Sequence, residues 1–126
     1  ILAQGMMENA ARVGAALKAR LAALMQRYGF IGDVRGEGLL LAFEFVADRE
    51  TRAPLPREMK AFDDLVERAY AEGLIIYSRR SRGGYAGDHF LVCPPMITTE
   101  AQVDEIMEKL IRALDGFAAG HAGQLA

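Results

Sequence analysis

The stretch Asp88-His89-Phe90-Leu91-Val92-Cys93-Pro94-Pro95-Met96-Ile97-Thr98-Thr99-Glu100 decides the fold of this chain. It predicts a buried strand around residues 90–93 that ends at the double proline, because proline has no backbone N–H to donate to a neighbouring strand. Thr99 followed by Gln102 matches a capping box, in which two residues satisfy each other's free backbone donors at the start of a helix. The sequence therefore predicts a strand that runs through two prolines into a capped helix.

Apolar residues at every third or fourth position predict three amphipathic helices. The first runs from about residue 2 to 28, the second begins near Pro56 and is closed by Gly73, and the third follows Thr99. Their apolar stripes are, in order, Met6, Ala10, Val13, Leu17, Leu21, Leu24 and Tyr28; Phe62, Leu65, Val66, Ala69 and Tyr70; and Val103, Ile106, Met107, Leu110, Ile111, Leu114 and Phe117. Beyond residue 116 we expect a fraying tail.

The segments between the helices have the composition of strands. Residues 31–47 contain Gly32-Asp33-Val34-Arg35-Gly36-Glu37-Gly38-Leu39-Leu40 and predict either two adjacent strands or one strand with a bulged lead-in. The glycines at 36 and 38 either permit a bulge or let another backbone come close. Residues 74–77 predict a short buried strand, and residues 78–87, with three arginines, three glycines and two serines, predict a loop.

The order helix, strand, strand, helix, strand, strand, helix predicts an α/β fold. We expect a two-layer α/β sandwich, in which helices cover one face of a small, mainly antiparallel sheet. A length of 126 residues suits one domain, so residues 1–126 are taken as a single unit. The chain begins without methionine in what reads as mid-helix, and we expect it to be a piece of a longer protein.

Composition excludes several classes of protein. Hydrophobic residues make up 52% and charged residues 25%, which predicts an ordered globular chain. A formal net charge of -2 gives no electrostatic reason to expect nucleic acid or a membrane as a partner. The single cysteine, Cys93, cannot form an intramolecular disulfide and does not support a structural zinc site, so we expect a small buried side chain, no metal and a cytoplasmic protein.

The two quoted stretches resemble the C-terminal small domain of class III aminotransferases, the pyridoxal-phosphate enzymes that include the omega-transaminases. The resemblance covers nearly the whole chain. Its most specific parts are the turn at residues 35–39 and the strand-to-helix junction at residues 93–98. It implies a ping-pong amino transfer between an amino acid or amine and a keto acid, with pyridoxal 5'-phosphate as cofactor. It also implies a homodimer with sites near the subunit interface.

The catalytic lysine of such an enzyme is expected to lie outside this chain. Lys18, Lys60 and Lys109 each occupy a polar position of a predicted helix, where a solvated lysine is the ordinary interpretation. We therefore expect no catalytic residue here, no cofactor-binding residue, and no activity or cofactor binding from the chain alone. His121 falls in the tail and is expected to be inert.

Four residues are candidates for binding substrate. Arg79, Arg80 and Arg82 lie among glycines in the predicted loop, and a guanidinium suits bidentate binding of a carboxylate. Solvent exposure is the commoner state for any one of these arginines, and a ligand-facing arginine is an equal alternative only for the group as a whole. His89 follows Asp88, so this pair either stabilises the turn into the strand or places the histidine against substrate.

The resemblance selects among the arginines. Many class III enzymes that act on α-amino acids carry an arginine three residues before the double proline, and here that position is Leu91. The omega-transaminases instead use a mobile arginine from the preceding loop, which implies Arg82, with Arg80 or Arg79 as alternatives if the loop is longer. The rival interpretation of the chain is a stand-alone α/β module that binds a small ligand or a partner protein.

Overall fold

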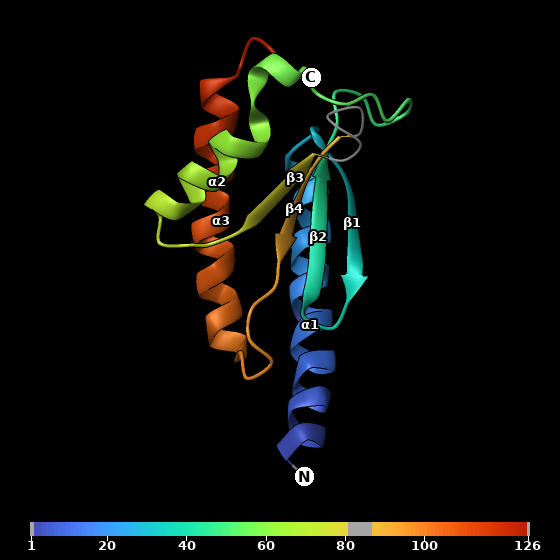
Figure 1. Cartoon of the computed structure of the whole chain (residues 1–126), viewed down its shortest axis with the longest axis vertical. Coiled ribbons are helices and arrows are strands. Elements are labelled where there is room, and N and C mark those ends of the chain that lie inside the picture. Colours follow the sequence, from blue (N-terminus) through green and yellow to red (C-terminus); the bar gives the residue numbers. More distant parts are fainter. Residues whose placement is uncertain (1, 81–86, 126) are drawn as a thin grey trace.

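The elements follow one another in the predicted order, with one short helical turn added (Figure 1). The computed structural model describes residues 2–80 and 87–125. In chain order the elements are α1 (Leu2–Arg27), β1 (Ile31–Glu37), β2 (Leu40–Phe45), the 3-10 turn η1 (Arg57–Met59), α2 (Ala61–Ala71), β3 (Tyr77–Arg80), β4 (Asp88–Val92) and α3 (Glu100–Gly120).

The strands form one antiparallel sheet in the order β1-β2-β4-β3. β1 and β2 are a hairpin, and their register shifts between Ile31 and Asp33, so the chain has both the two strands and the irregular lead-in that the sequence left as alternatives. β4 lies in the middle of the sheet beside β2, and β3 is an edge strand.

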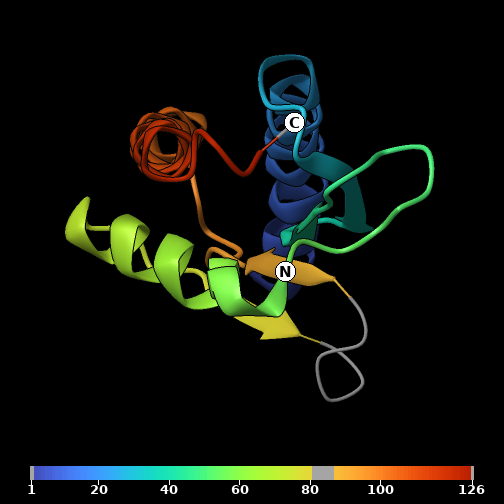
Figure 2. The same ribbon diagram turned by 90° about the horizontal axis from the view of Figure 1, so that it is seen from above.

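The helices form a second layer on one face of the sheet, which confirms the two-layer α/β sandwich. α1 packs on β1 and β2, α2 packs on β3 and β4, and α3 packs against both of these helices. Seen from above, α1 and α3 lie on one side of the strands and no helix lies on the other (Figure 2). The core between the layers holds Phe43, Phe45, Phe90 and Phe117, each at most 1% exposed.

Polar contacts fix α1 to α3 along their length. Arg20 pairs with Asp104 at 2.7 Å, and Arg27 pairs with Asp115 at 3.0 Å. The Tyr28 hydroxyl donates to Asp115 at 2.5 Å. Burial and this hydrogen bond raise the pKa of Tyr28 well above its ordinary value. The C-terminal end of α1 and the residue after it are therefore tied to the C-terminal part of α3 through the carboxylate of Asp115.

The C-terminal end of α1 is capped by a residue from the loop after β2. The guanidinium of Arg49 donates to the carbonyl of Met25, to that of Tyr28 at 3.0 Å and to that of Ile31 at 3.1 Å. The last carbonyls of a helix have no partner within the helix, so a long cation placed over them supplies the missing donors. Sequence patterns do not predict this contact, because 18 to 24 residues separate Arg49 from the carbonyl groups that it binds.

Two predicted elements are wrong in detail. Residues 74–77 are not a buried strand: β3 begins at Tyr77, and Ile75 and Tyr77 are 71% and 65% exposed, while Ile76 is 2% exposed. The second helix does not begin at Pro56, because η1 intervenes and Lys60 adopts a left-handed backbone (φ 50) before α2 starts. Tyr70, expected on the apolar stripe of this helix, is 71% exposed.

The tail and the cysteine also differ from expectation. α3 continues to Gly120, and His121 does not fray with the tail: its Nε2 lies 2.6 Å from Asp64 of α2 and its ring packs on Phe117. Cys93 is exposed rather than buried, because the chain leaves the sheet at Val92. None of the helices within the described ranges is both long enough and apolar enough to span a membrane.

Candidate functional site

A charged row crosses the sheet at the end where β4 begins. His89 of β4 is the register partner of Glu44 on β2 and of Arg79 on β3, and Glu44 is in turn the partner of Asp33 on β1. Arg35 lies 3.0 Å from Asp33 and 3.8 Å from Glu44. Glu44 and His89 are half-buried, so this row is a polar strip between solvent and the interior of the sheet.

Two of the arginine candidates, Arg79 and Arg80, lie at the same end. Arg79 and Arg80 are in β3 and not in a loop, which corrects the expectation of a loop for residues 78–80. Arg80 is the register partner of Asp88, a residue that is 1% exposed. Arg82 lies outside the described residues. The structure therefore brings His89 and Arg79 opposite one another across two strands.

Leu91 occupies the position where the resemblance implies an arginine in enzymes for α-amino acids. It pairs in register with Ala42 of β2 and with Tyr77 of β3, and it is half-buried. Ala42, Leu91 and Tyr77 thus form an apolar row across β2, β4 and β3. It lies two residues further along β4 than the charged row, which contains His89. A carboxylate bound near Leu91 would need its cation from another segment.

The turn between β1 and β2 explains the glycines of the first motif. Gly36 and Gly38 have φ values of 125° and 55°, which favour glycine. Gly38 also touches α1: a Cβ added at Gly14 would lie 2.1 Å from the Gly38 carbonyl oxygen. Lys18 of α1 donates to the carbonyl of Gly36 at 2.9 Å. The motif is thus a tight turn pressed against a helix, and Lys18 holds it in place.

The junction after β4 is a second fixed turn. The backbone N–H and the hydroxyl of Thr98 both donate to the carbonyl of Pro95, at 3.0 and 2.5 Å. The amide of Asn9 on α1 donates to the carbonyls of Met96 and Thr98, at 2.8 and 2.9 Å. The predicted capping box is present at Thr99, which confirms the start of α3. One asparagine therefore anchors the turn at residues 95–98 to α1.

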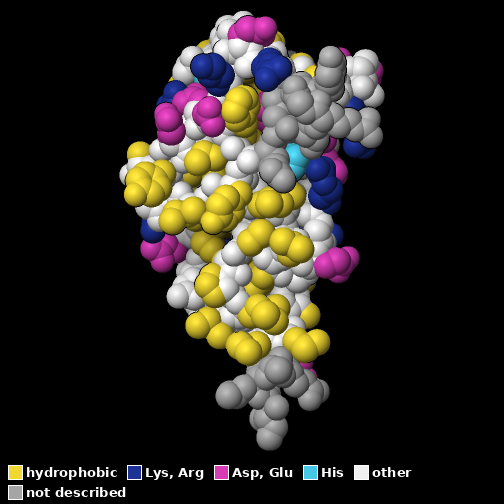
Figure 3. Space-filling view, in the orientation of Figure 1, with side chains coloured by type: hydrophobic (Ala, Val, Ile, Leu, Met, Phe, Trp, Pro, Cys, Tyr) yellow, Lys and Arg dark blue, Asp and Glu magenta, His cyan; other side chains and the backbone are white. Residues whose placement is uncertain are grey.

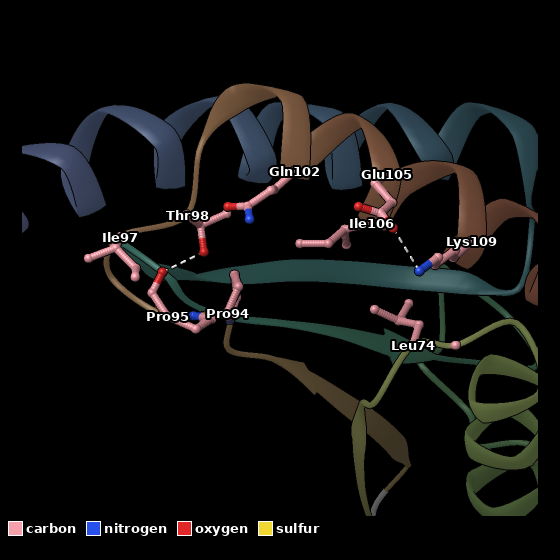
Figure 4. Close-up of a pocket in the computed structure, with 10 residues that line it drawn as sticks. Leu74, Pro94, Pro95, Ile97, Thr98, Gln102, Glu105, Ile106 and Lys109 are labelled. Carbon is pink, nitrogen blue, oxygen red and sulfur yellow. Dashed lines mark hydrogen bonds and ion pairs between the residues drawn. The ribbon is translucent and has the colours of Figure 1, made fainter.

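A cavity of about 290 Å³ lies between α3 and this turn (Figure 4). Leu74, Ile97 and Ile106 supply apolar walls, and Lys109 and Glu105 of α3 form an ion pair at 2.9 Å. The hydrogen bond from Lys109 lowers the pKa of the Glu105 carboxyl. The two charges thus neutralise each other.

A second cavity, of about 710 Å³, lies on the other side of the turn, between α1 and the β1–β2 hairpin. Met7, Ala15, Leu40 and Met96 line it with apolar surface. Its lysine, Lys18, is held by the hairpin carbonyl described above. Neither cavity brings together groups for acid–base catalysis, and the described residues contain no cluster of three or more His, Cys, Asp or Glu able to hold a metal ion.

The lysines do not fit a cofactor site. Lys18 is bound to Gly36, Lys109 is bound to Glu105, and Lys60 is exposed at the left-handed residue before α2. A lysine that forms a Schiff base must be placed against the aldehyde of the cofactor, usually with its charge suppressed by burial or by a cationic neighbour. None of these three lysines is both buried and free of a hydrogen-bonding or ionic partner.

The fold is shared with solved transaminase structures. The chain is similar to an amine transaminase from an uncultivated Pseudomonas species in the PLP-bound form, with a TM-score of 0.78, 29% identity and coverage of 90% of this chain and 24% of that one. A thermostable (S)-enantioselective omega-transaminase from Thermomicrobium roseum gives a TM-score of 0.78, 30% identity and coverage of 92% and 24%.

The sequence comparisons identify the family. The model for "Aminotransferase class-III" matches residues 1–114. An uncharacterized aminotransferase of Bacillus subtilis, YodT, is 34% identical over 108 residues, which cover 85% of this chain and 24% of that protein. A taurine–pyruvate aminotransferase of Rhodobacter capsulatus is 36% identical over 116 residues, which cover 92% and 25%. The chain belongs to the class III aminotransferase family and spans about a quarter of the length of these relatives.

Proposed function

We propose that this chain, residues 1–126, is the C-terminal small domain of a pyridoxal-phosphate-dependent aminotransferase that transfers an amino group between an amino acid or amine and a keto acid. The observation that carries the proposal is the family match over residues 1–114, together with a fold shared with omega-transaminases at TM-scores near 0.78. The relative named for taurine and pyruvate supports pyruvate as a keto acid to test first.

The remainder of the enzyme supplies the cofactor chemistry in this proposal. Pyridoxal 5'-phosphate acts as an electron sink when it is bound through a lysine, and the lysines of this chain are not placed for that role. The fragment alone is inactive, and the whole protein is a cytoplasmic homodimer.

The role of this domain is to close the substrate pocket and to supply a cation for a substrate carboxylate. Arg82 is the first candidate, with Arg80 and Arg79 as alternatives, and His89 lines the pocket beside them. Leu91 at the position three before the double proline supports an arginine from elsewhere. The half-buried His89 and its register partner Arg79 support a pocket at this end of the sheet.

The test uses the full-length enzyme with Arg82→Ala, Arg80→Ala or Arg79→Ala. A charge-assisted hydrogen bond contributes about 1.5–3 kcal/mol, or roughly 10- to 150-fold in binding. One of the three variants lacks the arginine that binds the substrate carboxylate. In that variant kcat/KM for alanine or pyruvate should fall by roughly 10- to 150-fold, and activity toward amines without a carboxylate should be retained.

The other two arginine variants serve as matched controls and should affect the two substrate types alike. Equal loss of both activities in all three variants, or no loss in any of them, would show that these arginines do not bind the carboxylate.

A further inference from the structure

The cavity between α3 and the turn at residues 95–98 has one pair of opposite charges on mainly apolar walls. Glu105, Ile106 and Lys109 border it from one face of α3, since residues three or four apart in a helix are neighbours. The other apolar walls are formed by Leu74, Pro94, Pro95 and Ile97. Figure 4 shows Ile97 at one end of the cavity and the ion pair of Lys109 and Glu105 towards the other.

Thr98 and Gln102 add two further polar side chains to the wall, and both already bond to the backbone. The hydroxyl of Thr98 donates to the carbonyl of Pro95, and the amide oxygen of Gln102 accepts from the N–H of Thr99. Figure 3 shows hydrophobic side chains over the middle and lower part of the molecule and charged side chains mainly at its upper end and edges. Apolar walls with a few placed polar groups are the usual composition of a small-molecule pocket.

Lys109 is held at the cavity from two sides. Its Nζ lies 2.9 Å from Glu105, and its side chain is 25% exposed. The other side is the turn after α2, because a methyl group added at Gly73 would lie 3.4 Å from the same Nζ. An ammonium group has three N–H donors, so a single contact with Glu105 leaves donors for a ligand.

Glu105 supplies the opposite charge at the same end of the cavity. The hydrogen bond from Lys109 lowers the pKa of its carboxyl, so the group is ionised at neutral pH. A carboxylate accepts several hydrogen bonds through its two oxygens, and Glu105 receives Lys109 on one of them. The cavity thus offers a cationic donor and an anionic acceptor side by side, with no net charge.

A pair of this kind favours a ligand that also carries both charges. A simple anion would meet Lys109 but would be repelled by Glu105, and a simple cation would meet the reverse arrangement. The ammonium and carboxylate of an α-amino acid are attached to the same carbon, so they can face two protein charges that lie 2.9 Å apart. The apolar walls beside the ion pair then select the side chain.

We propose that this cavity binds an α-amino acid with an apolar side chain in its zwitterionic form. The ligand carboxylate accepts from Lys109, its ammonium donates to Glu105, and its side chain lies on Leu74 and Ile106. The volume of about 290 Å³ is at the lower end of the roughly 300–1,000 Å³ of small-molecule pockets, which suits a ligand of this size. Arg79 and His89 do not line this cavity, so the site is additional to the proposed substrate residues.

The experiment measures binding of cycloleucine to the full-length protein by isothermal titration calorimetry. Cycloleucine is a zwitterion with an apolar ring and has no hydrogen on Cα that amino transfer could remove. Lys109→Met and Glu105→Gln should each weaken binding by roughly 10-fold or more, because each removes one charged contact. Glu108→Gln is the matched control, since Glu108 is exposed on α3 and does not line the cavity, and its affinity should be unchanged.

Two fragments of the probe test the need for both charges. Cyclopentylamine lacks the carboxylate and cyclopentanecarboxylate lacks the ammonium, so each should bind roughly 10-fold or more weakly than cycloleucine. Either fragment binding as tightly as cycloleucine would overturn the proposal in favour of a simple cation or anion site. Equal affinity for cycloleucine in Lys109→Met, Glu105→Gln and Glu108→Gln, or no binding to the unsubstituted protein at millimolar concentration, would also overturn it.

Stability of the variants is measured in parallel by thermal unfolding. An exposed ion pair four residues apart on a helix contributes little to stability, so the midpoints of Lys109→Met and Glu105→Gln should stay close to that of the unsubstituted protein. If Lys109→Met does not fold, the comparison of Glu105→Gln with Glu108→Gln decides the outcome. Amino transfer by the unsubstituted protein is assayed separately, so a failure of the proposed function would leave this binding result unchanged.

Discussion

Gly14 lies in the middle of α1 although alanine is the better helix former at such a position. The reason is the contact with the β1–β2 turn, because a methyl group at residue 14 would overlap the backbone of Gly38. Gly5, in the same helix, has no atom within 4 Å of the corresponding methyl position. Packing therefore requires a glycine at position 14 but not at position 5.

Gly14→Ala and Gly5→Ala should consequently change stability in opposite directions. Gly14→Ala should lower the free energy of unfolding by about 1–3 kcal/mol or more, since rigid backbone must move to admit the methyl group. Gly5→Ala should raise it by about 0.5–1 kcal/mol through helix propensity. Urea denaturation of the two variants measures both values. A stabilising Gly14→Ala would mean that α1 does not pack on the turn.

Single residues show where sequence reasoning ends. The sequence predicted that the glycines at 36 and 38 either permit a bulge or let another backbone come close. The structure shows the second at Gly38, whose backbone lies against Gly14 of α1. Lys18 and His121 gave no signal of their contacts, because each partner is far along the chain. Cys93 was expected to be a small buried side chain at the end of a strand over residues 90–93, whereas β4 ends at Val92 and Cys93 is exposed.

At the scale of elements, α1 and α3 are joined by a hydrogen bond whose donor can ionise. Burial and the bond to Asp115 raise the pKa of Tyr28 in the folded state. Its contribution to stability is therefore fully present below the unfolded value of about 10 and is lost as the pH rises from there toward the folded pKa. The helix contact should weaken in alkaline solution.

Tyr28→Phe should flatten the fall in stability above about pH 10. At neutral pH the same variant should lose about 0.5–1.5 kcal/mol, because the hydrogen bond to Asp115 is gone. Tyr70→Phe is the control, since Tyr70 is exposed on α2. Urea denaturation over a pH series checks the effect. The same alkaline slope in Tyr28→Phe as in the unsubstituted chain would contradict it.

Helices were predictable from the sequence where apolar residues recur at every third or fourth position over a long segment. The long stripes of α1 and α3 and the capping box at Thr99 specify those helices locally. The prediction for residues 74–77 failed because four consecutive apolar residues indicate burial on both sides, whereas Ile76 is buried, Leu74 packs on the core while half-buried, and Ile75 and Tyr77 are exposed.

At the scale of the whole molecule, the order of elements and the two motif turns sufficed to predict the sandwich. The sequence did not predict which strands are neighbours, because the pairing of β2 with β4 depends on contacts between distant segments. The candidate site was predicted only as a set of residues. Its shape depends on the rest of the enzyme, and the expectations for Arg82, Arg80, Arg79 and His89 remain predictions.

The most direct measurement is the position of the cofactor-bearing lysine. Borohydride reduction of the full-length enzyme with pyridoxal 5'-phosphate, followed by peptide mass spectrometry, should place the label on a lysine outside residues 1–126. The chain alone, treated in the same way, should carry no specific label on Lys18, Lys60 or Lys109. Specific labelling of any of these three lysines, or no label anywhere in the full-length enzyme, would contradict the proposal that this chain is the small domain of a pyridoxal-phosphate aminotransferase whose catalytic lysine lies outside residues 1–126.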